Sequence, residues 1–139
     1  MSFKNMNYQI NDALGLIMCK PNHDLCIDDL YTHQQDLLND PSFYVGINAL
    51  YDYRLVNKIS GNLNALMKIA NTMKDRRVIS KASSVAVIID PNNHSLMQVF
   101  KGYQLMVSNS LVKCEIFSPK QYDLALKFVG IENLPSYFH

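Results

Sequence analysis

The chain has 139 residues, of which 48% are hydrophobic and 18% charged, a composition that excludes a disordered chain. Thirteen basic residues nearly balance twelve acidic ones, so no net field favours nucleic acid or an anionic membrane surface. No apolar run approaches the ~18 residues of a membrane span, and three cysteines without a secretory signal suggest reduced thiols. We therefore expect one cytoplasmic domain over 1–139, with its core in 6–130 and a tail at 131–139.

The first predicted elements are a β-hairpin and a helix. Two short apolar runs, 6–10 and 16–20, are separated by turn residues that end in Gly15, which favours an antiparallel hairpin. A helix follows and ends before Pro41, because proline disfavours a helical residue ahead of it. Gln34 interrupts its apolar stripe, which falls at positions 27, 30, 31, 37 and 38.

The rest of the chain alternates between strand-like runs and amphipathic helices. Three apolar runs predict strands at 45–51, 84–89 and 111–117. Three stretches with helical spacing predict helices at 63–73, 96–107 and 119–129. Asn93 is the expected N-cap of the middle helix.

This order predicts an α/β fold with a five-stranded, mostly parallel sheet, one antiparallel N-terminal strand and four helices. The elements follow one another as β-β-α-β-α-β-α-β-α, and right-handed crossovers place helices on both faces of the sheet. Sheets of this kind commonly bind ligands beyond the carboxyl ends of their strands, so we expect a functional site there.

Three phrases of the sequence carry a resemblance to a known family. Asp24–Leu30 spans the start of the first helix, Leu38–Phe43 its end, and Ala49–Arg54 the end of the third strand. With the order of elements over 6–130, these phrases resemble STAS domains, the anti-sigma-factor-antagonist-like family. The nearest resemblance is to small stand-alone bacterial members, for which lipid-transfer (CRAL-TRIO-like) relationships are also discussed. The resemblance implies a non-enzymatic regulatory module that binds a protein partner.

Regulatory STAS proteins are phosphorylated on a serine in an Asp-Ser-Ser/Thr-Gly turn before the second helix. The matching segment here is Ile59-Ser60-Gly61, which lacks the aspartate and the second hydroxyl residue. Ser60 is therefore the candidate phosphoacceptor that the resemblance implies. The structural alternative is a plain N-cap of the second helix.

Polar residues at the predicted strand ends form a second candidate site. Asp52 and Asp90 close two parallel strands at one edge of the sheet, and Arg54 lies near enough in sequence to pair with a carboxylate. With His94 they define a strand-end crevice, whose two carboxylates suit acid–base chemistry or the binding of a metal. The alternative is that both aspartates serve turns or caps.

Apolar residues on the third helix and in the preceding loop form a third candidate. They suit either a partner surface or the mouth of an apolar pocket, and the alternative is that they complete the core. The set is Tyr53, Leu55, Val56, Met97, Phe100, Tyr103, Leu105 and Met106. Tyr137 and Phe138 are further candidates for docking on a neighbouring subunit.

The remaining cysteines, histidines and basic residues suggest no chemistry. Cys26 is predicted at a helix N-cap, where nearby aspartates oppose the helix dipole, so we expect an ordinary thiol. His33 is predicted to be solvated, and the four histidines lack metal-ligand spacing. The basic cluster near Arg76 lacks interleaved aromatics and is interpreted as a solvated helix end, so we expect neither a metal nor nucleic acid.

Three functions follow, in order of preference. The first is a non-enzymatic STAS-like module, without a cofactor, that binds a protein partner or its own copy. The second is a carrier of a small apolar or lipid-like ligand, in a pocket lined by Phe100, Tyr103 and Met106. The third is an enzyme that uses Asp52, Asp90 and His94.

Overall fold

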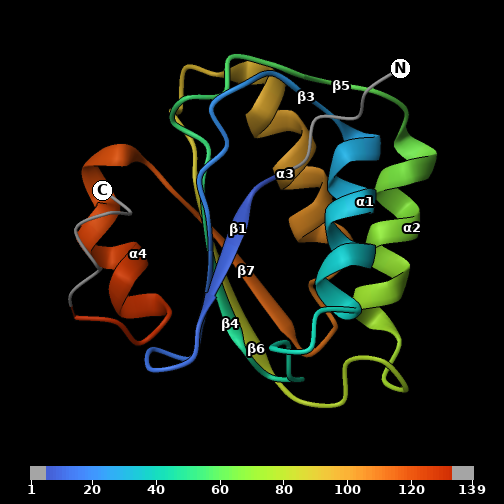
Figure 1. Ribbon diagram of the computed structural model, residues 1–139. Coiled ribbons are helices and arrows are strands. Elements are labelled where there is room, and N and C mark those ends of the chain that lie inside the picture. Colours follow the sequence, from blue (N-terminus) through green and yellow to red (C-terminus); the bar gives the residue numbers. More distant parts are fainter. Residues whose placement is uncertain (1–5, 133–139) are drawn as a thin grey trace.

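A computed structural model describes residues 6–132 and contains a five-stranded sheet (Figure 1). The strand order is β1-β2-β4-β6-β7, with β1 antiparallel to β2 and the other pairs parallel. The predicted fold class is therefore confirmed. The strands are β1 (Tyr8–Asn11), β2 (Leu16–Cys19), β4 (Asn48–Asp52), β6 (Ser83–Ile88) and β7 (Val112–Phe117).

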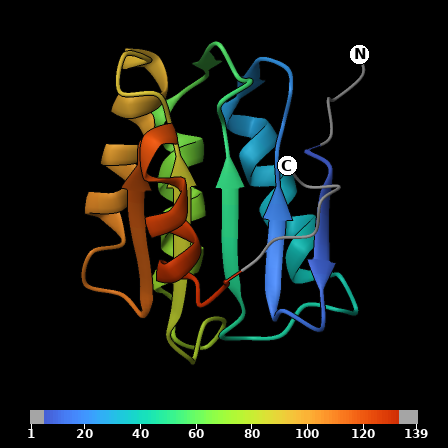
Figure 2. The same cartoon turned by 90° about the vertical axis from the view of Figure 1, so that its left-hand side faces the viewer.

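Four α-helices cover the two faces of the sheet within this part of the chain. On one face lie α1 (Ile27–Leu38), α2 (Leu63–Lys74) and α3 (His94–Met106), and on the other lies α4 (Tyr122–Phe128), as Figures 1 and 2 show. A 3₁₀ turn, Pro119–Gln121, leads into α4. The predicted cap of α3 is confirmed, since the side chain of Asn93 accepts a hydrogen bond from the Leu96 N–H.

The strand order explains why three helices share one face. From β2 onward each crossover moves one strand in the same direction, and right-handed crossovers then place every helix on the same side. The order never reverses, whereas the crevice of a doubly wound sheet forms where it does. The physical basis for expecting a site beyond the carboxyl ends of these strands is therefore absent.

Alternation along the strands produces two cores. Residues that face α1, α2 and α3 include Ile17, Ala49, Tyr51, Val85, Val87, Val112 and Cys114. Residues that face α4 include Leu16, Met18, Leu50, Ala86 and Ile88, which pack on Ala125, Leu126 and Val129. The run in β6 is apolar on both faces for this reason, as its sequence predicts.

A second, two-stranded parallel sheet was not expected from the sequence. It pairs β3 (Leu25–Cys26) with β5 (Ile59–Ser60), just before α1 and α2 begin. Gly61 follows with φ of +122°, and a Cβ there would lie 3.0 Å from the backbone nitrogen of Ile27. The close approach of the two helix starts thus requires glycine at this position.

None of the helices within 6–132 is long and apolar enough to cross a membrane.

Candidate functional site: an apolar cavity beneath the helices

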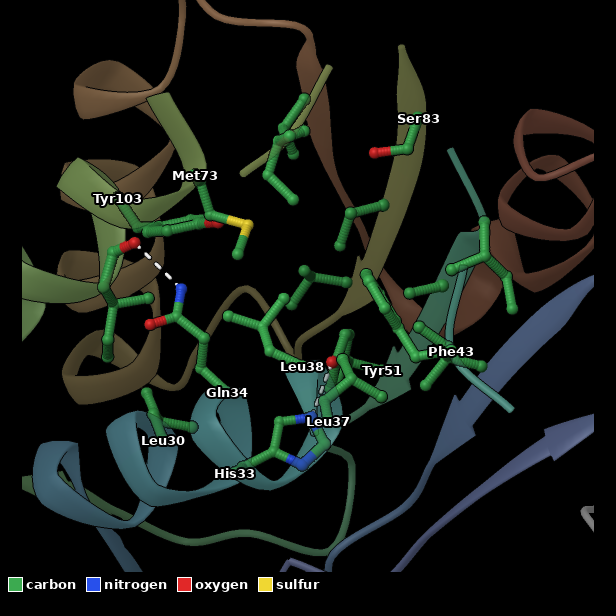
Figure 3. Close-up of a pocket in the computed structure, with 18 of the residues that line it drawn as sticks. Leu30, His33, Gln34, Leu37, Leu38, Phe43, Tyr51, Met73, Ser83 and Tyr103 are labelled. Atoms are coloured by element: carbon green, nitrogen blue, oxygen red, sulfur yellow. Dashed lines mark hydrogen bonds between the residues drawn. The ribbon is translucent and has the colours of Figure 1, made fainter. Parts of the chain in front are cut away.

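A cavity of about 130 Å³ lies between the three-helix layer and the sheet. The strands contribute Ile17, Ala49, Val85, Val87 and Val112, and the helices contribute Leu30, Leu37, Leu66, Ile69, Met73 and Phe100. Figure 3 shows how such side chains surround the space. These residues are apolar because each strand presents alternate positions to the helices and each helix presents its inner stripe.

The cavity communicates with solvent at the amino-terminal edge of the parallel strands. Among the partly buried lining residues, Leu38, Phe43, Met73 and Ser83 come from the ends of α1 and α2 and from the segments leading into β4 and β6. Val85 is also only partly buried, although it belongs to a strand with neighbours on both sides. This edge is opposite to the one at which the sequence led us to expect a site.

A histidine on α1 lies inside this cavity wall. His33 is 6% exposed, and its Nε2 shares a hydrogen bond of 2.7 Å with the Tyr51 hydroxyl of β4. Burial lowers the pKa of His33 to about 4, so the ring is neutral near pH 7. Its Nδ1 is buried and finds no partner among the described residues. The expectation of a solvated His33 is wrong, because α1 turns this position inward.

The neighbouring residue, Gln34, is also buried, at 4% exposure. Its Nε2 donates a hydrogen bond of 3.0 Å to the backbone carbonyl of Ile69 on α2. Its Oε1 is buried without a hydrogen-bond partner within 6–132. Figure 3 shows the carboxamide rising from α1 toward Tyr103, whose phenol also lines the cavity.

Among the described residues, the cavity wall carries no ionised side chain. Within 6–132 its lining includes no aspartate, glutamate, lysine or arginine, and His33 is neutral. Burial also raises the pKa values of Tyr51, Tyr53 and Tyr103, which keeps their hydroxyl groups protonated. A charged molecule would lose its hydration there without gaining a counter-ion, so the site suits neutral ligands.

The predicted strand-end crevice proves to contain an ion pair whose carboxylate is buried. Asp52 is fully buried and faces the α4 side, where its carboxylate accepts hydrogen bonds of 3.0 Å and 2.6 Å from the Arg54 guanidinium. Lys20 lies 4.0 Å from the same carboxylate, and the guanidinium stacks over the Tyr122 ring. The expected pairing of Asp52 with Arg54 is therefore present.

The other two crevice residues do not join this pair. Asp90 is exposed, and its carboxylate accepts a hydrogen bond of 2.9 Å from the Asn92 N–H, which makes it a turn residue. His94 is an exposed residue at the start of α3. Among residues 6–132 no hydrogen bond or ion pair links either of them to Asp52. No hydrogen bond or ion pair in the described residues therefore joins the three groups that the enzyme hypothesis requires.

The apolar set around α3 divides between core and surface. Tyr53, Val56 and Phe100 are buried in the core, as the structural alternative predicts. Met97, Tyr103 and Met106 are partly buried against the same core. Leu55 and Leu105 alone of this set are exposed, at 54% and 76%. Tyr53, Phe100 and Tyr103 line the cavity, whereas Met106, expected there, does not.

Ser60 and Cys26 are the two candidate residues at the helix starts. Ser60 is exposed in β5 but is not the cap of α2, because Asn62 performs that role by accepting from the Ala65 N–H. Cys26 is the N-cap of α1 as predicted, and its backbone N–H donates to Asp29 at 2.8 Å. Burial raises the pKa of the Cys26 thiol, in line with an unreactive cysteine.

Two further predictions concern metals and the C-terminal tail. No cluster of three or more potential metal-binding side chains occurs in the described part of the chain. Tyr137 and Phe138 lie outside the described residues.

Sequence reasoning missed His33 and Gln34, although a signal for them was present. The buried positions of α1 are 27, 29, 30, 33, 34 and 37, so both polar residues fall on the inner stripe. Polar residues on the apolar face of an amphipathic helix are costly to bury, and their placement suggests a role. In the sequence, Gln34 is visible only as an interruption of the apolar stripe.

Comparison with known proteins yields no match among protein-family models, curated proteins or solved structures.

Proposed function

We propose that this protein reversibly binds a small, neutral, predominantly apolar ligand in the cavity between the three helices and the sheet. The observation that carries the proposal is a solvent-connected apolar cavity of about 130 Å³ with buried polar atoms left unpartnered in its wall. Well-packed interiors leave few voids larger than a water molecule, and most buried polar groups find partners. A bound ligand would fill this void and bury its apolar wall.

The volume limits the ligand to about the size of one aromatic ring or a short aliphatic chain. A dry cavity of ~150 Å³ lined by leucine, isoleucine and phenylalanine binds benzene, which sets the scale. The cavity here has a comparable size and lining. Long-chain lipids do not fit it without movement of α1 or α2.

Toluene is a suitable first probe, because it is neutral, apolar and of this size. A ligand that binds only the folded state raises the melting temperature as its concentration rises above Kd. We expect a dose-dependent rise for the wild type and none for Ala49→Leu, which fills the cavity from β4. Ala13→Leu, at an exposed position in the first turn, is the matched control and should respond like the wild type.

Nuclear Overhauser effects locate the probe independently of any variant. Contacts from toluene to the methyl groups of Leu37, Met73 and Val85 would support the proposal, because all three line the cavity. Binding that produces contacts only to Met106 or Leu105, or no binding at millimolar toluene, would contradict it.

A protein-interaction module is the second candidate, and one observation favours it. Leu105 on α3 is 76% exposed and Leu55 is 54% exposed, so both present apolar surface that a partner could cover. The resemblance to STAS domains points the same way. The two functions are compatible, because the exposed side of α3 faces away from the cavity that its inner residues line.

A further inference from the structure

We infer that the cavity selects neutral ligands that carry one carbonyl oxygen, such as a small aldehyde or ketone, and that the Tyr103 hydroxyl donates a hydrogen bond to this oxygen. The inference rests on the proposed function and specifies its ligand class. It follows from which polar atoms of the cavity wall a ligand can reach.

Two unpartnered polar atoms of the wall are out of reach. Gln34 Oε1 and His33 Nδ1 are both buried and closed off from the space of the cavity. The other polar atoms of these side chains are occupied, since Gln34 Nε2 donates to the Ile69 carbonyl and His33 Nε2 shares a hydrogen bond with the Tyr51 hydroxyl. Both side chains therefore fasten α1 to its neighbours, and a ligand forms no hydrogen bond with them.

The hydroxyl group of Tyr103 differs from these two atoms. Tyr103 lines the cavity from α3, and its hydroxyl makes no hydrogen bond within 6–132. Although unpartnered, this oxygen is not closed off, so it retains accessible surface. Figure 3 shows the ring of Tyr103 running beside Met73, among the side chains that surround the cavity. Burial raises the pKa of the phenol, so the oxygen keeps its hydrogen near pH 7 and can donate it.

Tyr53 carries a second unpartnered hydroxyl in the cavity lining, but it is less accessible. Its ring stacks on those of Tyr51 and Phe100, at 6.0 Å and 4.8 Å between centroids. Tyr53 is only 3% exposed, whereas Tyr103 is partly buried against the same core. Tyr103 is therefore the better placed donor for a bound molecule.

A carbonyl oxygen suits this donor better than a hydroxyl group does. Buried donors are rarely left without an acceptor, and a carbonyl brings an acceptor without a hydrogen of its own. An alcohol brings a further O–H, and the other hydroxyl groups of the lining, on Tyr51, Tyr53 and Ser83, are also donors. Aliphatic amines and carboxylic acids are ionised at pH 7 and find no counter-ion among the described residues of the wall.

Three probes with equal numbers of non-hydrogen atoms test the inference: benzaldehyde, benzyl alcohol and ethylbenzene. NMR titration at pH 7 follows their binding through the methyl signals of Met73 and Val85, which line the cavity. We expect benzaldehyde to bind the wild type more tightly than benzyl alcohol, whose hydrogen lacks a free acceptor. Tyr103→Phe removes one oxygen and should weaken benzaldehyde by about three- to tenfold, as expected for one hydrogen bond, while ethylbenzene binds nearly unchanged. Comparing each probe between two proteins cancels the differences in hydration among the probes.

Two further substitutions test the assignment to Tyr103. Tyr44→Phe removes a hydroxyl from a tyrosine that is 49% exposed and does not line the cavity, so it should bind all three probes like the wild type. Tyr53→Phe should weaken benzaldehyde less than Tyr103→Phe does. Because the Tyr103 hydroxyl has no partner in the described structure, Tyr103→Phe should unfold at the wild-type temperature or above it.

The outcomes separate the inference from the proposed function. The carbonyl inference is wrong, and the proposed function stands, if Tyr103→Phe affects benzaldehyde no more than ethylbenzene. The same holds if benzyl alcohol binds the wild type more tightly than benzaldehyde, or if Tyr53→Phe has the larger effect. If none of the three probes shifts the signals of the cavity residues, the proposed function fails and the inference fails with it.

Discussion

His33 Nε2 lies 2.7 Å from the hydroxyl oxygen of Tyr51, and this bond joins α1 to the second parallel strand of the sheet beside the cavity. Tyr8 completes the surroundings, with its ring edge-on to the imidazole at 5.1 Å between centroids. The imidazole is therefore enclosed by aromatic rings and aliphatic side chains rather than by water. Its charge state is coupled to the stability of the fold.

We predict that acid destabilises the protein through His33. The folded-state pKa, about 4, lies below the unfolded value of 6.5. The unfolded chain therefore binds a proton at higher pH than the folded chain does. Stability is complete above pH 6.5 and falls as the pH is lowered toward 4, by up to about 3 kcal/mol.

Denaturant unfolding at pH 7 and pH 4.5 measures this effect. His33→Leu should reduce the loss of unfolding free energy between the two pH values, whatever its stability at pH 7. His94→Gln removes an exposed imidazole and controls for the loss of a histidine as such. An unchanged pH dependence in His33→Leu would show that other groups cause the acid sensitivity.

The Asp52–Arg54 pair, in which the carboxylate is buried, has an exposed counterpart, which makes a matched comparison possible. Asp75 and Arg77 have the same spacing and also form a bidentate pair, but the Arg77 side chain is 90% exposed. Asp52 is fully buried, and its loss leaves Arg54 and Lys20 facing a neutral group. Both cations retain some contact with water, which limits the penalty.

Asp52→Asn should lower the free energy of unfolding by about 2 kcal/mol, below the 3–5 kcal/mol typical when one partner of a fully buried pair is removed. Asp75→Asn should change stability little, since exposed pairs contribute little. Chemical denaturation of both variants measures the difference. Equal effects would mean that burial of Asp52 contributes nothing. Ligand binding should survive both substitutions, because neither aspartate lines the cavity.

Periodicity located the elements well because local patterns carry that information. The helices at 63–74 and 94–106 and the strands of β6 and β7 lie within a few residues of the predicted ranges. The sharing of one face by three helices depends on strand order, which no local pattern encodes. The short β3–β5 pair joins segments more than 30 residues apart, and two-residue strands leave no periodicity to detect.

The cavity was harder to predict for a related reason. His33 and Gln34 are tolerable inside the protein only because Tyr51 and Ile69, 18 and 35 residues away, supply hydrogen bonds. Helical spacing places both side chains inward, but polar side chains are usually exposed, so the sequence favoured a position in solvent. The opposite error concerns the aspartates at the strand ends, whose position suggested a functional site. Asp90 is a turn residue, and Asp52 forms an ion pair with Arg54.

The last prediction tests the interaction surface on α3. Leu105→Glu replaces the most exposed apolar side chain of the candidate set with a carboxylate and should leave the fold intact, because that side chain is 76% exposed. If α3 mediates self-association, the variant should be monomeric at concentrations where the wild type forms dimers.

Gln98→Glu, an exposed position on the same helix, controls for added charge. Native mass spectrometry and sedimentation measure the assembly state. A wild type that is monomeric throughout, or a dimer that survives Leu105→Glu, would remove α3 as a self-association surface and leave the cavity as the principal functional feature.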